Sequence, residues 1–293
     1  MWLVVDPACN YTSSALAVQI QFKGVNMLKK KNEALFVGVD IGSLTTKAVA
    51  YSPSGIIVTA MIPTGVIPEK SGREILENVL ASADVSRKEV NAVVATGYGR
   101  ITAEYADKTI TEITCHAKGA HYLHASTRTI VDIGGQDCKV IRLDEDGNVA
   151  DFAMNDKCAA GTGRFLEVIS QVFKISLEEM GTLAQSEAPL VPINNTCTVF
   201  AESEIISLLA RGERAESILK GVFRAIASRV SGIAARIGVD GDVFFSGGVA
   251  KNCGMVAALE EVLQCPIVSL EFDPQLVGAL GAAVLASELR VKS

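Results

Sequence analysis

Short apolar runs that end in glycine turns alternate along this chain with longer segments of helical periodicity. Apolar runs bounded by turn residues are typical of strands, whereas an apolar position every three or four residues is typical of helices. The pattern predicts strands at residues 35–40, 47–52, 56–63, 91–100, 128–135, 139–144, 148–155 and 242–245. It predicts helices at residues 72–83, 116–125, 163–172, 177–185, 200–210, 215–237 and 277–289. This mixture of strands and helices indicates an α/β fold.

An internal repeat groups six of these strands into two copies of one unit. Residues 40–47, DIGSLTTK, align without a gap with residues 132–139, DIGGQDCK, and the hairpin glycines Gly55 and Gly147 keep the same offset of 92 residues. Each copy reads as a strand, a tight turn, a second strand, a glycine hairpin and a third strand. Glycine turns also recur by chance, but chance rarely preserves both features at one offset. We therefore expect two similar lobes facing each other across a cleft.

The repeat and the helical second half suggest how the chain divides. We expect lobe I to comprise residues 34–113 and 271–293, and lobe II to comprise residues 114–270. Residues 1–33 read as an N-terminal extension, because the first 26 residues have no clear period and no basic region ahead of their apolar stretch. Two interpretations stay open: a disordered segment read from a start codon upstream of the native one, or an added strand or helix.

Charge, hydropathy and cysteine usage exclude several classes of protein. The net charge of −6 lacks the basic footprint of a nucleic-acid or anionic-membrane binder. No uninterrupted apolar run approaches the ~18 residues that a membrane-spanning helix needs. The seven cysteines form an odd set without close pairing, which argues against a secreted disulfide framework. We expect a cytoplasmic protein without nucleic-acid or membrane partners, in which a special cysteine acts as a ligand or nucleophile.

The two DIG turns have the chemistry of a phosphate site. Glycine in a tight turn lets backbone N–H groups face an anion, and an aspartate at the strand end can hold Mg²⁺ or its water. Asp40 and Asp132 are therefore candidate catalytic residues, since phosphoryl transfer depends on positioning and charge neutralisation. Lys47 either contributes a cation or points outward. The candidate nucleotide-binding residues are Gly42, Ser43, Thr45, Thr46, Lys47, Gly134, Gly135, Gln136, Gly247, Gly248 and Lys251.

In this order the motifs resemble those of the acetate kinase, sugar kinase, Hsp70 and actin superfamily over residues 34–293. DIGSLTTK resembles the first phosphate loop and DIGGQDCK the second, while residues 244–252, FFSGGVAKN, resemble the adenosine loop. Residues 277–286, VGALGAAVLA, resemble the second connecting helix. The resemblance implies a two-lobed actin/Hsp70/hexokinase-type fold with duplicated β-hairpin sheets, which binds ATP or ADP with Mg²⁺. No G-x-x-x-x-G-K-[ST] motif occurs, so a P-loop site is excluded.

Two further segments do not belong to sugar kinases. Residues 155–168, NDKCAAGTGRFLEV, and 194–205, NNTCTVFAESEI, together with DIGGQDCK closely resemble the ATP-dependent activators of 2-hydroxyacyl-CoA dehydratases and the related benzoyl-CoA reductase subunits. The resemblance implies that Cys158 and Cys197 each give one thiolate, so that a homodimer holds one 4Fe–4S cluster on its two-fold axis. It also implies one-electron transfer to a dehydratase-like or reductase partner, with reduced ferredoxin or flavodoxin as the donor.

The residues make independent sense of this ligand set. A four-iron cluster usually takes four thiolates, so two ligands per chain require a symmetric dimer if a cluster is bound. Both cysteines precede a helical pattern, and thiolates at helix N-termini are stabilised by the dipole and the exposed amides. A single cysteine is more often a small buried hydrophobe, and we interpret Cys115, Cys138, Cys253 and Cys265 in this way.

The hypothesis that follows couples lobe closure in an ATPase to a cluster at helix ends. Glu112, near the end of residues 110–113, ITEI, is a candidate for orienting the attacking water. The alternative interpretation of Glu112 is an ordinary helix N-terminal carboxylate. A small-molecule kinase of the same fold, acting on a sugar or a carboxylate, is the main alternative function. A regulatory or chaperone-like ATPase that only binds partners is the third.

Overall fold

The computed structural model describes residues 19–22, 33–155, 157–194 and 197–289. The chain forms two compact units. The first unit contains the described residues of Ser14–Thr127, Leu143–Ala150 and Leu270–Ser293, and the second contains those of Arg128–Arg142 and Asp151–Ser269. The expected boundary between the lobes lay at residues 113 and 114, whereas the compact units change over at residues 127 and 128.

The first unit is built on a six-stranded mixed sheet with the order β1-β4-β3-β2-β5-β6. Its elements are β1 (Gln19–Phe22), β2 (Leu35–Ile41), β3 (Thr45–Ser52), β4 (Gly55–Pro63), α1 (Pro68–Ser82), β5 (Val90–Thr96), β6 (Lys108–Thr109), α2 (Glu112–Leu123) and α8 (Val277–Glu288), with short 3₁₀ helices at Arg87–Glu89, Tyr98–Thr102 and Pro274–Leu276. Strands β2, β3 and β4 are antiparallel neighbours, and β5 pairs with β2 in parallel.

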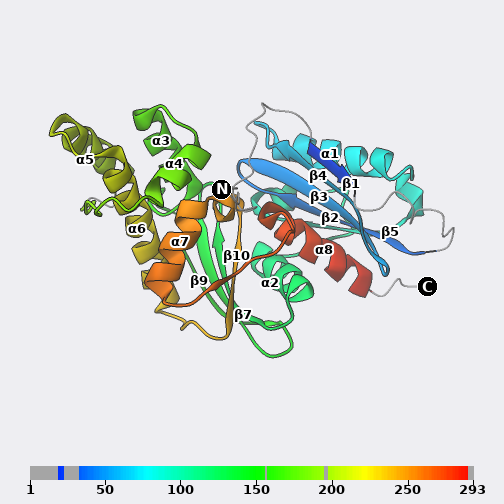
Figure 1. Cartoon of the computed structure of the whole chain (residues 1–293). Coiled ribbons are helices and arrows are strands. Elements are labelled where there is room, and N and C mark those ends of the chain that lie inside the picture. The colour runs from blue at the N-terminus through cyan, green and yellow to red at the C-terminus, as the bar shows by residue number, and fades with distance from the viewer. Residues whose placement is uncertain (1–18, 23–32, 156, 195–196, 290–293) are drawn as a thin grey trace, which may run out of the picture. The chain divides into compact units, whose positions relative to one another are not determined.

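Every residue of β2 is buried, because helices cover both faces of the sheet. Alternate side chains such as Val37 and Val39 join the core under α1, whereas Phe36 joins the core under α8. Gly38 lies so close to α8 that a Cβ there would be 2.0 Å from the backbone oxygen of Ala279. This close approach brings the middle of β2 next to helix α8, and Figure 1 shows α8 and α2 side by side against this sheet.

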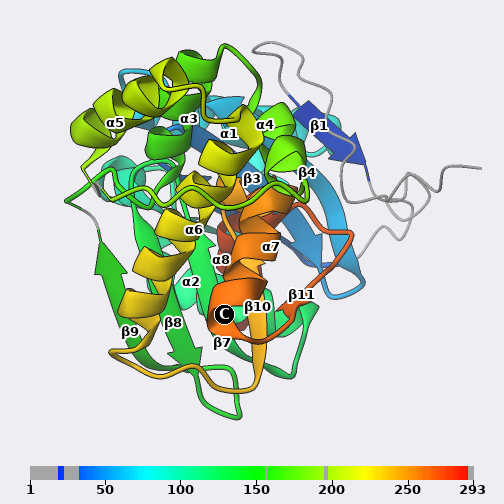
Figure 2. The same cartoon turned by 60° about the vertical axis from the view of Figure 1, so that its left-hand side comes forward.

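The second unit is built on a five-stranded sheet with the order β11-β10-β7-β8-β9. Its elements are β7 (Thr127–Ile133), β8 (Cys138–Leu143), β9 (Val149–Asn155), α3 (Gly163–Phe173), α4 (Leu177–Ala184), α5 (Thr198–Ala210), α6 (Ala215–Ala234), β10 (Asp242–Ser246), α7 (Cys253–Leu263) and β11 (Ile267–Val268), with a 3₁₀ helix at Gly248–Lys251. Figure 2 shows α6 and α7 packed alongside each other over this sheet.

The duplication is larger than the aligned motifs. The order β4-β3-β2-β5-β6 of the first sheet matches β9-β8-β7-β10-β11 of the second, so each hairpin unit is followed by two further strands in equivalent positions. The strand pairing also explains the repeated lysine. Asp40 lies opposite Lys47 in the β2–β3 register, and Asp132 lies opposite Lys139 in the β7–β8 register.

Several predicted elements have different bounds in the structure. Helix α1 begins at Pro68, which occupies the first turn, where its missing N–H leaves no intrahelical bond unmade. Helix α2 begins at Glu112 after the N-cap Thr111, and it packs on α8 through Gly281, where a Cβ would lie 1.7 Å from the Cys115 oxygen. This packing explains why α2 belongs to the first unit. Helix α7 and strand β11 were not predicted from the sequence pattern.

Part of the expected N-terminal extension pairs with the first sheet. Strand β1 is antiparallel to β4, with Gln19 opposite Met61. Residues 19–22 form a strand here, and residues 1–18 and 23–32 of the expected extension lie outside the described residues. None of the helices in the described part of the chain combines the length and apolarity that crossing a bilayer requires.

Candidate nucleotide loops and cysteine-bearing segments

The first candidate phosphate loop follows strand β2. Its backbone is closed by the Gly42 N–H, which donates to the Thr45 oxygen at 3.1 Å. Asp40 is only 5% exposed, and its Oδ2 accepts from the Lys47 ammonium at 3.1 Å. Lys47 therefore does not point outward to solvent. Lys47 forms an ion pair with Asp40, because the two oppositely charged residues are cross-strand neighbours.

The two threonines of this loop face different ways. Thr46 is fully buried, and its hydroxyl lies 2.8 Å from that of Thr64, which in turn donates to the Gly42 oxygen. Thr46 thus stabilises the loop through Thr64, from the buried side of the strand. Thr45 and Ser43 are half-buried, so their side chains stay accessible at the turn.

The second candidate phosphate loop has the same closure and a denser charge network. The Gly134 N–H donates to the Asp137 oxygen at 3.0 Å. Asp132 is almost fully buried; Lys139 Nζ lies 3.1 Å from its Oδ2, and Ser246 donates to its Oδ1 at 3.0 Å. Lys139 Nζ also lies 2.6 Å from Asp137 Oδ2. Gly135 is half-buried and Gln136 is exposed at the tip of the loop.

A glycine that follows β5 in the first unit, and another that follows β10 in the second, each lie against the buried aspartate of that unit. Gly97 follows β5 with φ 84°, and a Cβ there would lie 2.3 Å from Asp40 Oδ1. Gly247 follows β10 with φ 87°, and a Cβ there would lie 2.8 Å from Asp132 Oδ1. Sequence analysis missed Gly97. The common signal is an apolar strand followed by Thr-Gly or Ser-Gly, at residues 93–97 and 243–247.

The expected adenosine loop leads directly into helix α7. Gly248 is exposed and Lys251 half-buried in the 3₁₀ turn, and the Asn252 side chain accepts from Met255 N at 3.1 Å as the N-cap of α7. Asn252 also donates to the Leu177 oxygen at 2.6 Å, which ties α4 to this loop. The loop therefore sits where α4 and α7 meet within the second unit.

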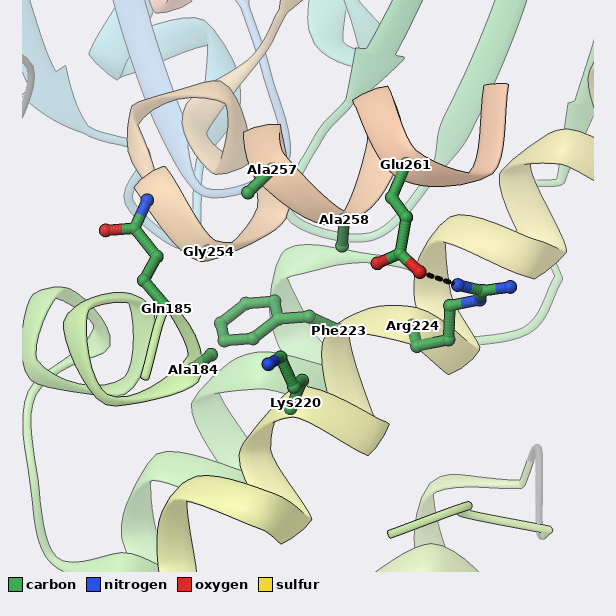
Figure 3. Close-up of a pocket in the computed structure, with 9 residues that line it drawn as sticks. All are labelled: Ala184, Gln185, Lys220, Phe223, Arg224, Gly254, Ala257, Ala258 and Glu261. Atoms are coloured by element: carbon green, nitrogen blue, oxygen red, sulfur yellow. Dashed lines mark hydrogen bonds and ion pairs between the residues drawn. The ribbon is translucent and has the colours of Figure 1, made fainter. Parts of the chain in front are cut away.

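A pocket of about 200 Å³ opens beside this junction, between α4, α6 and α7 (Figure 3). Its floor carries Phe223 and small residues such as Gly254 and Ala257. Arg224 and Glu261 form an ion pair at one side, and Gln185 reaches the Cys253 oxygen at the other. The pocket thus combines an apolar floor with a few polar groups at its rim.

Glu112 lies at the first position of α2, in the first turn after the N-cap Thr111. A carboxylate in this position is stabilised by the exposed amides and the helix dipole. Glu112 therefore lies at a helix N-terminus, and its role in orienting the attacking water stays a prediction.

The cysteines differ strongly in their surroundings. Burial raises the pKa of the Cys115 and Cys138 thiols to about 12, as expected for small core residues. Cys158 is half-buried in the segment before α3, where Asn155 donates to its backbone oxygen at 2.9 Å. Cys197 is exposed and is the N-cap residue of α5.

Cys158 and Cys197 belong to neighbouring parts of the second unit, because α3 and α5 pack against each other. Within the described ranges, no group of three or more His, Cys, Asp and Glu side chains could hold a metal ion.

The second phosphate loop is bonded directly to the helix that follows Cys158. The Gly163 N–H donates to the Gly134 oxygen, and the Arg164 N–H donates to the Gly135 oxygen, each at 2.9 Å. These are the first two residues of α3, whose N–H groups have no partner within the helix. The backbone of the loop and the start of α3 are therefore joined by two hydrogen bonds.

Comparisons with known proteins agree with these features. The activator of lactoyl-CoA dehydratase from Anaerotignum propionicum is 45% identical over 256 residues, covering 87% of this chain and 98% of the relative. The (R)-2-hydroxyglutaryl-CoA dehydratase activating ATPase from Acidaminococcus fermentans is 41% identical over 260 residues, covering 87% and 98%.

Solved structures show the same relationship. The activator of the 2-hydroxyisocaproyl-CoA dehydratase from Clostridium difficile with bound ADPNP superposes with a TM-score of 0.81 at 42% identity, covering 87% of this chain and 94% of that one. A ROK family glucokinase from Streptomyces griseus, at 12% identity and a TM-score of 0.54, covers 87% and 100% and shares the fold alone. The two-lobed actin-like fold expected from the motifs is therefore confirmed. The model of the BadF/BadG/BcrA/BcrD ATPase family matches residues 37–286, and the chain belongs to this family of ATP-hydrolysing proteins.

Proposed function

We propose that this ATPase uses ATP hydrolysis to drive a low-potential one-electron transfer from a 4Fe–4S cluster, held by two copies of the chain, to a 2-hydroxyacyl-CoA dehydratase-type partner. A benzoyl-CoA reductase-type partner would accept an electron in the same way. The observation that carries the proposal is the pair of 2.9 Å hydrogen bonds from Gly163 and Arg164 to the second phosphate loop. They connect a loop suited to phosphate with the segment that bears Cys158.

The coupling follows from the loop's chemistry. ATP and ADP make different contacts with the amides of residues 134–136. Each nucleotide therefore favours its own position of the loop backbone. Because the first amides of α3 are bonded to Gly134 and Gly135, the start of α3 follows that change. Helix α5 packs against α3, so the surroundings of Cys197 respond as well.

The cysteines support a site shared by two copies. Cys158 and Cys197 supply two thiolates per chain, and a bound four-iron cluster would provide the one-electron redox step. Val199 and Phe200, next to Cys197 on α5, are 67% and 63% exposed. Large apolar side chains beside an exposed ligand favour contact with a second copy, which completes a symmetric homodimer.

The remaining residues are assigned to the nucleotide. Asp40 and Asp132 would organise Mg²⁺ and its waters, and each DIG turn has backbone amides suited to phosphate oxygens. The base and ribose would bind at Gly247, Gly248 and the adjoining pocket, whose lining includes Phe223 and the Arg224–Glu261 ion pair. Reduced ferredoxin or flavodoxin would return the electron after each transfer.

Anaerobic purification followed by iron and sulfide analysis tests this function. We expect about four irons per dimer. Cys158→Ser and Cys197→Ser should each lose the iron while ADP binding is kept, because the nucleotide residues are untouched. Cys265→Ser is the matched control, since this half-buried thiol lies outside both segments and should leave the iron content unchanged. A metal-free monomer from oxygen-free cells would refute the electron-transfer function.

The alternative of a small-molecule kinase shares the fold and the loops. It predicts a colourless protein whose ATP consumption depends on a sugar or a carboxylate and yields a phosphorylated product. Measuring ATP turnover with and without such acceptors, together with the iron content, separates the two functions.

A further inference from the structure

The two lysines of the candidate phosphate loops are both paired with carboxylates of the protein, so neither offers an uncompensated positive charge to a phosphate. Lys47 is paired with Asp40 at 3.1 Å, and Lys139 is paired with both Asp132 and Asp137. The positive charges of the two repeated lysines are thus neutralised within the protein. The transition state of phosphoryl transfer spreads negative charge over the terminal phosphate, and proteins stabilise it with metal ions and cationic side chains.

Arg100 lies beside the first phosphate loop within the first unit. It belongs to the 3₁₀ turn Tyr98–Thr102, and its Nη1 donates to the Gly97 oxygen at 3.0 Å. Gly97 in turn packs its Cα against Asp40 Oδ1, where a Cβ would come within 2.3 Å. The guanidinium is therefore hydrogen-bonded to the glycine that lies next to the buried carboxylate.

Most of the Arg100 guanidinium remains available for binding. In the part of the chain that the structure describes, the hydrogen bond to Gly97 is its single hydrogen bond, and no carboxylate pairs with it. The side chain is half-buried, so it is held in place and yet accessible. An arginine presents five N–H donors in a planar fork, which matches the oxygens of a phosphate.

The internal repeat shows that this turn does not need an arginine to fold. The Arg100 N–H donates to the Gly97 oxygen at 3.2 Å, and the equivalent Ala250 N–H donates to the Gly247 oxygen at 3.3 Å. The same backbone turn therefore forms in the second unit with alanine at this position. Arg100 adds to the first unit a charge that the conformation does not require.

We propose that Arg100 is a catalytic residue of the ATPase, which binds the terminal phosphate of ATP and stabilises its negative charge during hydrolysis. This inference rests on the proposed nucleotide site. Water attacks the terminal phosphorus, the bond to the bridging oxygen of ADP breaks, and ADP, inorganic phosphate and a proton are released. Arg100 keeps its proton throughout, because a guanidinium stays charged at any pH at which the protein is folded.

The test compares Arg100→Ala and Arg100→Lys with Arg73→Ala in the full-length homodimer. Arg73 lies on α1 of the same unit, where it pairs with Glu69 on the surface, and its loss should leave ATP turnover unchanged. We expect Arg100→Ala to lower kcat for ATP hydrolysis by about 1,000-fold or more, the range of effects seen for arginines on a transferring phosphate. ADP binding, measured by calorimetry, should change by less than about threefold (below 1 kcal/mol).

Guanidinium chloride at low millimolar concentration should restore part of the turnover of Arg100→Ala and none of that of Asp40→Asn. Arg100→Lys should recover less than the wild type, because an ammonium lacks the fork. The proposal is overturned if Arg100→Ala hydrolyses ATP like Arg73→Ala, or if ADP affinity falls as much as kcat and guanidinium restores nothing. Iron content is measured on the same samples. If the wild-type protein contains no iron, the electron-transfer function is refuted, whereas the conclusion on Arg100 and ATP hydrolysis is unaffected.

Discussion

The Nζ of Lys139 lies 3.1 Å from the Oδ2 of Asp132, and both side chains are about 4% exposed. The two residues face each other across the β7–β8 pair, as Lys47 and Asp40 do across β2–β3. The repeated lysine therefore compensates the charge of the repeated aspartate. Each lysine places its ammonium beside a carboxylate in a buried loop, where an unpaired charge would be strongly disfavoured.

Lys139→Met should destabilise the protein, because it leaves Asp132 without its buried counter-ion. Breaking one side of a buried pair costs about 3–5 kcal/mol. Urea unfolding of the metal-free protein measures the loss. Lys47→Met is the matched control: its side chain is 12% exposed and water partly replaces it, so a smaller loss is expected. Equal effects of the two changes would contradict this account of the second loop.

Asp132→Asn should abolish ATP turnover while the purified protein keeps its iron. The change removes the charge proposed to organise Mg²⁺ and its water, and it leaves the cysteine segments intact. Steady-state ATP hydrolysis and iron analysis on the same preparation measure both properties. Asp146→Asn, on the exposed turn between β8 and β9, is the control and should retain full turnover. Turnover by Asp132→Asn at the rate of this control would remove Asp132 from the catalytic residues.

Gly163→Pro should uncouple the nucleotide from the cysteine segments. Proline is tolerated at the first position of a helix, but it has no N–H to donate to the Gly134 oxygen. We expect ATP hydrolysis and iron binding to persist, while the effect of ATP on the rate of iron removal by a chelator falls severalfold. Arg164→Ala keeps both N–H groups and should respond to ATP like the wild type. An unchanged response in Gly163→Pro would show that the coupling takes another route.

Gly281→Ala should destabilise the first unit. Its Cβ would lie 1.7 Å from the Cys115 oxygen, so α8 and α2 would have to separate, at a cost of about 1–3 kcal/mol for overpacking. Gly232→Ala, on the exposed face of α6 with open space around it, is the matched control. Alanine there should stabilise the protein by about 0.5–1 kcal/mol, because it favours the helix. Thermal unfolding measures both changes: the melting temperature should fall for Gly281→Ala and rise for Gly232→Ala.

Alkylation of metal-free folded protein should modify Cys197 first and spare Cys115 and Cys138. The thiolate is the reactive form, and burial raises the pKa of these two thiols to about 12, so they remain protonated at pH 8. Their contribution to stability is full below the ordinary thiol pKa near 9 and is lost as the pH rises towards 12. Peptide mapping after iodoacetamide treatment at pH 8 measures this order. Early labelling of Cys115 would contradict the packing of α2 on α8.

The sequence by itself determined the strands of the repeat, the two DIG turns and the helices that follow Cys158 and Cys197. These features depend on local patterns: alternation of apolar residues, glycine at turns and a helical period. The pairing of Asp40 with Lys47 could also have been inferred, because a hairpin places the two residues opposite each other.

Only the tertiary structure decided which loops meet. Gly97 packs against Asp40 and Ser246 bonds to Asp132 across 114 residues, and no local pattern encodes such distances. The bonds from α3 to Gly134 arise because the exposed amides of a helix start need acceptors and the loop backbone supplies them. Helix α2 joined the first unit for a similar reason, since its glycine-lined contact with α8 depends on close packing rather than on sequence order.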